Sequence, residues 1–143
     1  MNKTRIWQVD DPVAEARRIS RGNMAGYLGI EFLEAGDYWM RAKMPVDERT
    51  RQPAGVLHGG ASVVLAETLA STAAHFSLNP SSQYCVGLEI NANHIRTVRE
   101  GYVLGCATSM HLGRSTQVWE IRITDESEEV ICVSRCTMII LSK

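Results

Sequence analysis

The sequence lacks an excess of charge of either sign, and it lacks a long uninterrupted apolar run. Its 15 Lys and Arg residues balance 16 Asp and Glu residues, so no bulk positive field exists to hold nucleic acid or an anionic membrane surface. The longest apolar stretch in the middle of the chain is interrupted by Glu67, well short of the ~20 residues that a membrane-spanning helix needs. We therefore expect neither a nucleic-acid partner nor a membrane partner.

Cysteine is sparse, and its spacing matches no common metal site. Cys85, Cys106, Cys132 and Cys136 include no C-x-x-C pair, and the four His residues are scattered along the chain. The N-terminal segment MNKTRIWQVDDP also has no apolar core of a secretory signal. This pattern is typical of reduced core thiols, so we expect a cytoplasmic protein with no metal and no other cofactor.

The chain also has no G-x-S-x-G elbow, Walker loop, G-x-G-x-x-G or H-E-x-x-H motif. No internal repeat, low-complexity stretch or linker divides it. With 45% hydrophobic and 22% charged residues, the composition is that of a globular protein. We expect one domain over residues 1–143.

The first half of the chain predicts two helices around a hairpin. Asp11 followed by Pro12 is a plausible helix start, and the helix would end near Gly22, so residues 1–23 would form an N-terminal helical extension. Short apolar or alternating runs at 30–33 and 38–44 predict a hairpin. Residues 59–78 predict a long helix whose apolar stripe recurs at helical spacing: Leu65, Leu69, Thr72 and Phe76.

After Pro80 the hydrophobic pattern changes to period two. Four β-branched segments, 84–95, 101–111, 115–124 and 130–141, are separated by short turn signals. Short connections favour antiparallel neighbours, so these segments predict a four-stranded meander. The fold class is therefore α+β, with a long central helix wrapped by a curled antiparallel β-sheet.

One face of the long helix combines a single carboxylate with small residues. At about 100° per residue, Glu67 lies opposite the apolar stripe, and its neighbours there are Gly60, Val63, Ala70, Ser71 and Ala74. Residues this small suggest that something approaches the face closely.

The entry to the same helix is His58–Gly59–Gly60. The first amides of a helix have no partner within it and carry the positive end of its dipole, so a glycine there suits an oxyanion hole built from main chain. Gln52, in the preceding loop, could add an amide donor.

Each of these features also has a purely structural interpretation. The glycine pair can serve close packing, Glu67 can face solvent, His58 can be a structural hydrogen-bonding residue, and Ser71 can bond to a carbonyl of its own helix. The residues alone predict a carboxylate opposite a helix N-terminus and no more.

The segment HGGASVVLAETLAS resembles the active-site helix of hotdog-fold acyl-CoA thioesterases, in the branch with a catalytic Glu on the central helix. The similarity extends through MPVDERTRQPAGVLHGG, VGLEINANHIRTVREG and HLGRSTQVWEI, nearly the whole chain after about Met24. This branch includes 1,4-dihydroxy-2-naphthoyl-CoA hydrolases of menaquinone biosynthesis, proofreading thioesterases of enterobactin synthesis and phenylacetate-pathway thioesterases. The resemblance implies a hotdog fold.

The resemblance also implies hydrolysis of an aromatic CoA thioester, of the hydroxybenzoyl or 1,4-dihydroxy-2-naphthoyl type. Glu67 would be the nucleophile or general base, and the Gly59 amide would polarise the thioester carbonyl. His58 would fix the loop, Gln52 would contact the thioester end, and Ser71 would position the water.

Coenzyme A would bind to residues from three parts of the chain, as part of the substrate. These are Gly87; His94, Ile95, Arg96 and Thr97; and His111, Leu112, Gly113, Arg114, Ser115 and Thr116. The two arginines suit CoA phosphates, although exposed strand-end charges are an equal alternative. The family's active site lies between subunits, so Glu67 and Gln52 would come from opposite chains of a homodimer, pairing into a homotetramer.

Several alternatives stay open at this point. The chain could clear misacylated carrier protein, bind acyl-CoA without hydrolysing it, or act as a hotdog dehydratase on hydroxyacyl chains. Ala54 follows Pro53 where relatives often have Phe, and the residues after His75 differ too, which leaves the acyl specificity open.

Overall fold

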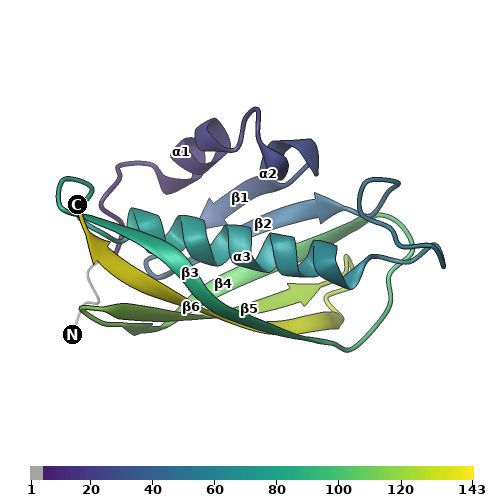
Figure 1. Ribbon diagram of the computed structural model, residues 1–143. Coiled ribbons are helices and arrows are strands. Elements are labelled where there is room, and N and C mark those ends of the chain that lie inside the picture. Colours follow the sequence, from purple (N-terminus) through teal and green to yellow (C-terminus); the bar gives the residue numbers. More distant parts are fainter. Residues whose placement is uncertain (1–4) are drawn as a thin grey trace.

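The computed structural model describes residues 5–143, and its long helix lies in the curve of one antiparallel sheet (Figure 1). The elements in chain order are α1 (Pro12–Ile19), α2 (Met24–Tyr27), β1 (Glu31–Ala35), β2 (Trp39–Pro45), α3 (Gly59–Phe76), β3 (Gln83–His94), β4 (Tyr102–Leu112), β5 (Thr116–Thr124) and β6 (Val130–Ser142).

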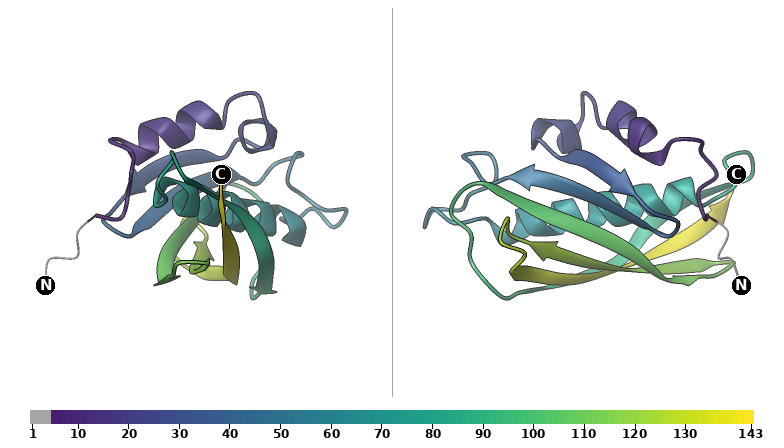
Figure 2. Two further views of the ribbon diagram at one scale, coloured as in Figure 1. Left: turned by 60° about the vertical axis from the view of Figure 1, so that its left-hand side comes forward. Right: turned by 180° about the vertical axis from the view of Figure 1, so that it is seen from behind.

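The strand order β1-β2-β4-β5-β6-β3 makes a six-stranded sheet in which every neighbouring pair is antiparallel. Seen from the end, the sheet curls around α3, while α1 and α2 lie on the side of β1 (Figure 2). This arrangement confirms the predicted α+β hotdog fold with a long central helix.

The predicted four-stranded meander is wrong for its first strand. β4, β5 and β6 are consecutive neighbours, but β3 pairs with β6 at the far edge of the sheet, and β2 takes the place beside β4. The short segment 95–101 crosses the ends of two strands to connect β3 with β4. A short connection therefore did not imply adjacency here, because the hairpin β1–β2 occupies the free side of β4.

The apolar stripe of α3 forms the centre of the core. Leu65 and Leu69 are fully buried and Phe76 nearly so, packed among sheet side chains such as Met40 and Trp119. A Cβ added at Gly105 of β4 would lie 2.6 Å from Leu69 Cδ1, so a glycine at this position lets the helix approach the sheet closely. The predicted stripe is confirmed for Leu65, Leu69 and Phe76, whereas Thr72 is half-buried and lines a surface hollow. Helix α3 ends at Phe76, two residues earlier than expected.

The N-terminal segment is anchored to the same core. Asp11 caps α1 by accepting hydrogen bonds from the amides of Val13 and Ala14, and Trp7 stacks on Trp119 with ring centroids 6.5 Å apart. The predicted helix start is confirmed, but α1 ends at Ile19, and the short helix α2 that follows was not predicted. No helix in the described range is long and apolar enough to cross a membrane. Residues 1–4 of the predicted extension lie outside the described residues.

Candidate active site

The N-terminus of α3 leaves one backbone amide without a partner. The Nδ1 atom of His58 accepts a hydrogen bond from the Gly60 amide at 2.8 Å, and the His58 carbonyl accepts from Ala61 and Ser62. Within residues 5–143, the Gly59 amide is therefore the only first-turn donor with no acceptor. It lies at the positive end of the helix dipole, where a developing negative charge is stabilised.

Gly59 is closely covered on its side-chain side. A Cβ added there would lie 2.8 Å from Nε2 of His94, which ends strand β3. The tip of the imidazole therefore fills the place that a side chain would take. This contact brings His94, predicted as a CoA-binding residue, to the entry of α3.

Glu67 lies two turns further along α3, half-buried, and is the only charged residue of that helix. A Cβ added at Gly87 of β3 would lie only 2.5 Å from Glu67 Oε1, so the carboxylate rests directly on the strand backbone at that glycine. In the part of the chain that the structure describes, Glu67 has neither an ion pair nor a hydrogen bond. Gly87 thus lies beside the carboxylate, and not beside the His94 stretch.

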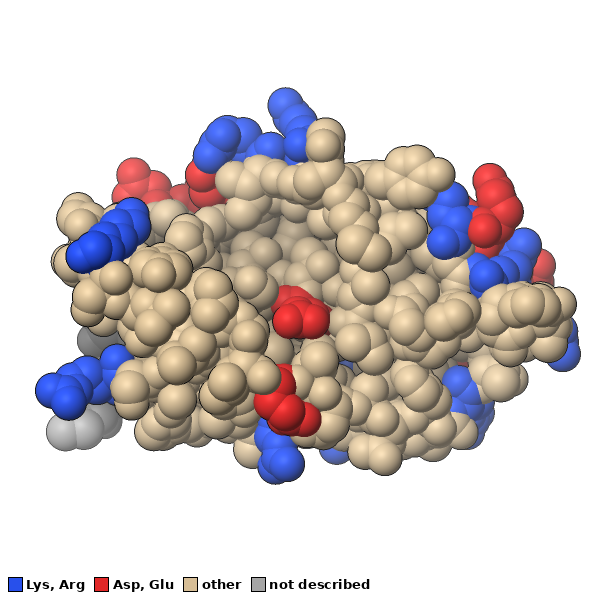
Figure 3. Space-filling model, viewed as in Figure 1, with Lys and Arg blue, Asp and Glu red and all other residues tan. Residues whose placement is uncertain are grey.

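The surface around Glu67 is the side of α3 that reaches solvent. We call it the exposed stripe of α3, and it consists of the exposed Gly60 and the half-buried Val63, Val64, Glu67, Thr68 and Ser71. Charged side chains gather mainly around the margins of this face, and its centre over α3 and β3 carries acidic side chains on an otherwise uncharged, partly hollowed surface (Figure 3). Ala70 and Ala74, predicted to share the carboxylate's face, are instead fully buried against the sheet.

The thiol of Cys136 lies under this region. Cys136 is fully buried on β6, and burial raises the pKa of its thiol to about 12, with the nearby carboxylates of Glu67 and Glu89 raising it further. A thiol with this pKa stays protonated and apolar at neutral pH. It serves as packing beneath Glu67. Cys132 is also buried, whereas Cys85 and Cys106 are only half-buried, so the prediction of core thiols holds for two of the four cysteines.

Gln52 belongs to a tight turn before α3. Its amide N–H donates to the Val56 carbonyl at 2.9 Å, and its side-chain Oε1 accepts from the Ala54 amide. Because the side-chain oxygen is engaged locally, the Nε2 donors of Gln52 are left for an external acceptor. Arg51 and Leu57 form an isolated antiparallel bridge that closes this loop ahead of His58.

The two predicted CoA-binding stretches lie at opposite ends of α3. The 94–97 stretch is at the Gly59 end, where the Ile95 and Arg96 amides donate to the Ile131 carbonyl. The 111–116 stretch belongs to the β4–β5 turn, and Gln117 next to it donates to Ser77 Oγ at the other end of the helix. Eighteen residues at ~1.5 Å each separate these ends by about 27 Å, so one chain does not bring the two stretches together.

The arginines of the two stretches differ in their surroundings. Arg96 pairs with Glu129 at 3.2 Å, with both side chains more than half exposed, which makes the pair weak. Arg114 is exposed and forms no ion pair with any residue from 5 to 143. Either guanidinium can therefore be drawn to an external anion at little cost.

Gly59 and Glu67 are also too far apart within one chain to act on the same atom. Eight residues of helix separate them by about 12 Å along the axis, whereas reacting atoms must come within about 3.5 Å of each other. Ser71, one turn beyond Glu67, lines a hollow of about 290 Å³ together with Met24 and Asn23 of the N-terminal segment. No sequence pattern pointed to those two residues, because the helix that Asn23 precedes and Met24 begins has only four residues and is too short to show a period.

Comparisons with known proteins show what the chain is similar to. Residues 54–132 match the family described as Thioesterase superfamily. The chain is 48% identical over 136 residues to the 1,4-dihydroxy-2-naphthoyl-CoA hydrolase of Escherichia coli, covering 95% of this chain and 99% of that protein. It is 45% identical over 136 residues to the proofreading thioesterase EntH of Cronobacter sakazakii, covering 95% and 98%.

Solved structures give the same result. A mutant thioesterase from Pseudomonas aeruginosa superposes with a TM-score of 0.94 at 42% identity, over 96% of this chain and 99% of that chain. A thioesterase from Haemophilus influenzae superposes with a TM-score of 0.92 at 44% identity, over 96% of this chain and 95% of that chain. The similarity thus includes α3 and its flanking loops.

Proposed function

The chain belongs to the thioesterase superfamily and is a thioester hydrolase, and from this premise we propose that it hydrolyses an aromatic acyl-CoA at a site formed by two copies of the chain. The acyl group would be of the hydroxybenzoyl or 1,4-dihydroxy-2-naphthoyl type. The observation that carries the proposal is that α3 presents, among residues 5–143, one unpartnered amide at Gly59 and one unpaired carboxylate at Glu67.

The Gly59 amide acts on the thioester carbonyl. As attack converts the carbonyl carbon to a tetrahedral centre, negative charge develops on the oxygen, and a preorganised N–H donor stabilises it by about 3 kcal/mol. His58 keeps this donor free by capping Gly60 instead. Gln52 adds a second donor through Nε2, since its Oε1 is already engaged.

Glu67 activates the other reactant. As a general base, it takes a proton from water while the water oxygen bonds to the thioester carbon; as a nucleophile, its own oxygen forms that bond and water cleaves the resulting anhydride. In both routes the C–S bond breaks and CoA leaves as a thiolate, which needs no strong acid. Ser71, on the next turn and with no hydrogen-bond partner among residues 5–143, positions the water.

The ~12 Å between Gly59 and Glu67 requires that they come from different protomers. A second copy with its α3 antiparallel would place its Glu67 near the first copy's Gly59, and a two-fold axis makes two such sites. The exposed stripe of α3 and the outer edge of β3 are available for this contact. β3 is a twelve-residue edge strand with exposed Tyr84, Val86 and Leu88, which favours pairing with another strand.

The same dimer would bring the two CoA-binding stretches together. The Gly59 end of one protomer carries residues 94–97, and an antiparallel partner would bring its own 111–116 turn toward that end. The CoA arm would then run from the thioester along His94–Thr97, with Arg96 and the partner's Arg114 as candidate phosphate ligands. Two such dimers would pair into a tetramer.

Substitution of Glu67 tests the proposal. Glu67→Ala and Glu67→Gln should lower kcat for 4-hydroxybenzoyl-CoA by at least about a hundredfold, measured as thiol release, with unchanged mass in light scattering. Measuring kcat/KM for the same acyl group on CoA and on a carrier protein shows which of the two carriers delivers the preferred substrate. Near-normal turnover by both variants would overturn the assignment of Glu67.

A further inference from the structure

Two hollows lie along the exposed stripe of α3, and they meet at one side chain. The first, of about 340 Å³, includes Leu28, His58 and Val64 in its lining. The second, of about 290 Å³, includes Ser20, Thr68 and Ser71. Met24 lines both, and among residues 5–143 no other residue does. It therefore forms the wall between them.

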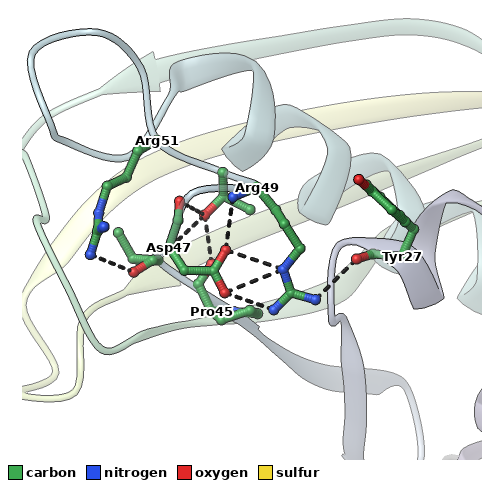
Figure 4. A network of polar contacts seen from close by, with 7 residues as sticks. Tyr27, Pro45, Asp47, Arg49 and Arg51 are labelled. Carbon is green, nitrogen blue, oxygen red and sulfur yellow. Dashed lines mark hydrogen bonds and ion pairs between the residues drawn. The ribbon is translucent and has the colours of Figure 1, made fainter.

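The backbone under Met24 is fixed from both sides. Arg49 donates to the Tyr27 carbonyl at 3.0 Å while its guanidinium pairs with Asp47 at 2.7 Å, which ties the end of α2 to the loop before α3 (Figure 4). The Ile30 amide donates to the Ala25 carbonyl at 3.0 Å. The Met24 side chain itself is 61% exposed. The flexible thioether side chain of Met24 can therefore change its rotamer while the backbone of α2 stays in place.

The second hollow begins one helical turn from Glu67, the residue proposed to act on the thioester. Ser71 follows Glu67 by one helical turn and lines this hollow, so the acyl group of a thioester held at Glu67 can reach it. Its volume is at the lower end of the range for small-molecule pockets, which suits one ring. A fused second ring needs the space beyond Met24. Hydroxyl and amide groups in the lining suit a ring that carries hydroxyls: Ser20, Asn23, Thr68, Ser71 and Thr72.

We propose that Met24 is the residue that sets the size of the acyl group. With its side chain extended, Met24 closes the second hollow around a single hydroxylated ring. With its side chain retracted, the two hollows join and admit a fused bicyclic acyl group. The inference rests on the proposed function, because it concerns the substrate of the same site.

The test compares two substrates across matched variants. The ratio of kcat/KM for 1-hydroxy-2-naphthoyl-CoA to that for 4-hydroxybenzoyl-CoA is measured for the wild type, Met24→Ala, Met24→Phe and Tyr27→Ala. Met24→Ala should raise the ratio at least about tenfold and Met24→Phe should lower it by a similar factor, since a change of even one methylene in a pocket alters such ratios by 10-fold or more. Tyr27→Ala, on the same helix, 73% exposed and lining neither hollow, should leave the ratio unchanged.

The outcomes distinguish a failure of the role of Met24 from a failure of the proposed function. A wild type that hydrolyses the substrates while neither Met24 variant moves the ratio would overturn the role of Met24 and leave the proposed function standing. An equal shift in Tyr27→Ala would also overturn it, since the effect would then belong to α2 as a whole. A wild type that hydrolyses neither substrate would overturn both.

Discussion

Replacing Gly87 by alanine should impair catalysis through a single added methyl group. That Cβ would lie 2.5 Å from Glu67 Oε1, whereas ordinary van der Waals contact begins at 3.4 Å. The carboxylate must therefore move by about 1 Å. A misplacement of about 1 Å at a reacting group costs on the order of a hundredfold in rate, so kcat should fall by about that factor.

The fold should tolerate this change. Gly87 is not among the residues with positive φ, and replacing a strand glycine by alanine reduces the entropy of the unfolded chain. The melting temperature of Gly87→Ala should therefore stay within a few degrees of the wild type. The matched control is the same substitution in the Glu67→Ala background, where no carboxylate remains to be displaced.

The measurement is kcat by thiol release for all four proteins, the wild type, the two single variants and the double variant. We expect strong non-additivity, in which Gly87→Ala costs about a hundredfold alone and almost nothing without Glu67. A Gly87→Ala variant with kcat within twofold of the wild type would refute the contact. An equal loss of kcat in the wild-type and Glu67→Ala backgrounds would refute the claim that Gly87→Ala acts by displacing the carboxylate.

Three further predictions concern the helix entry and the thiols. Gly59→Pro removes the unpartnered amide at a helix position that accepts proline, whereas Gly59→Ala keeps that amide. The kcat of Gly59→Pro should therefore be about a hundredfold below that of Gly59→Ala. Equal rates for the two variants would contradict the oxyanion role. His58→Ala should lower the melting temperature by about 3 °C in differential scanning calorimetry, because a helix cap contributes about 1 kcal/mol. His58→Asn should restore most of the lost melting temperature. An unchanged melting temperature in His58→Ala would exclude a capping role. Desolvation raises the pKa of the half-buried Cys85 to about 11 and that of the buried Cys136 to about 12, so both thiols should be alkylated slowly at pH 8 in the folded protein and faster as the pH rises or on unfolding. Labelling of both thiols in the native protein at the rate of the unfolded protein, followed by mass spectrometry, would contradict the raised pKa values.

The sequence was sufficient to predict the elements with a clear period. The stripe through Leu65 and Leu69 gave the long helix and its buried face, and the alternating segments after Pro80 gave the remaining strands. The Asp11–Pro12 pair gave the start of α1, because capping depends on adjacent residues. These elements could be predicted because hydrophobic periodicity and helix capping depend on residues close together in the sequence.

Features that depend on distant parts of the chain could not be predicted in this way. The place of β3 beside β6 is decided by where the β1–β2 hairpin docks, which no local pattern records. The contact of Gly87 with Glu67 joins a strand bulge to a helix, and the wall at Met24 comes from a helix too short to have a period. The carboxylate and the helix-entry amide were both predicted from residue types, and the predicted helix already sets their separation. Only the structure shows that His58 Nδ1 takes the Gly60 amide and leaves the Gly59 amide free.

The shared site can be tested most directly with mixed dimers that pair a Glu67→Ala chain with a Gly59→Pro chain. Each parent dimer lacks one essential group in both sites and should be nearly inactive. In the mixed dimer, isolated through two different tags, one of the two sites has its carboxylate and its amide from unaltered residues. Thiol release by this mixed dimer should return to about half of the wild-type rate per dimer. A mixed dimer no more active than its parents would contradict the account.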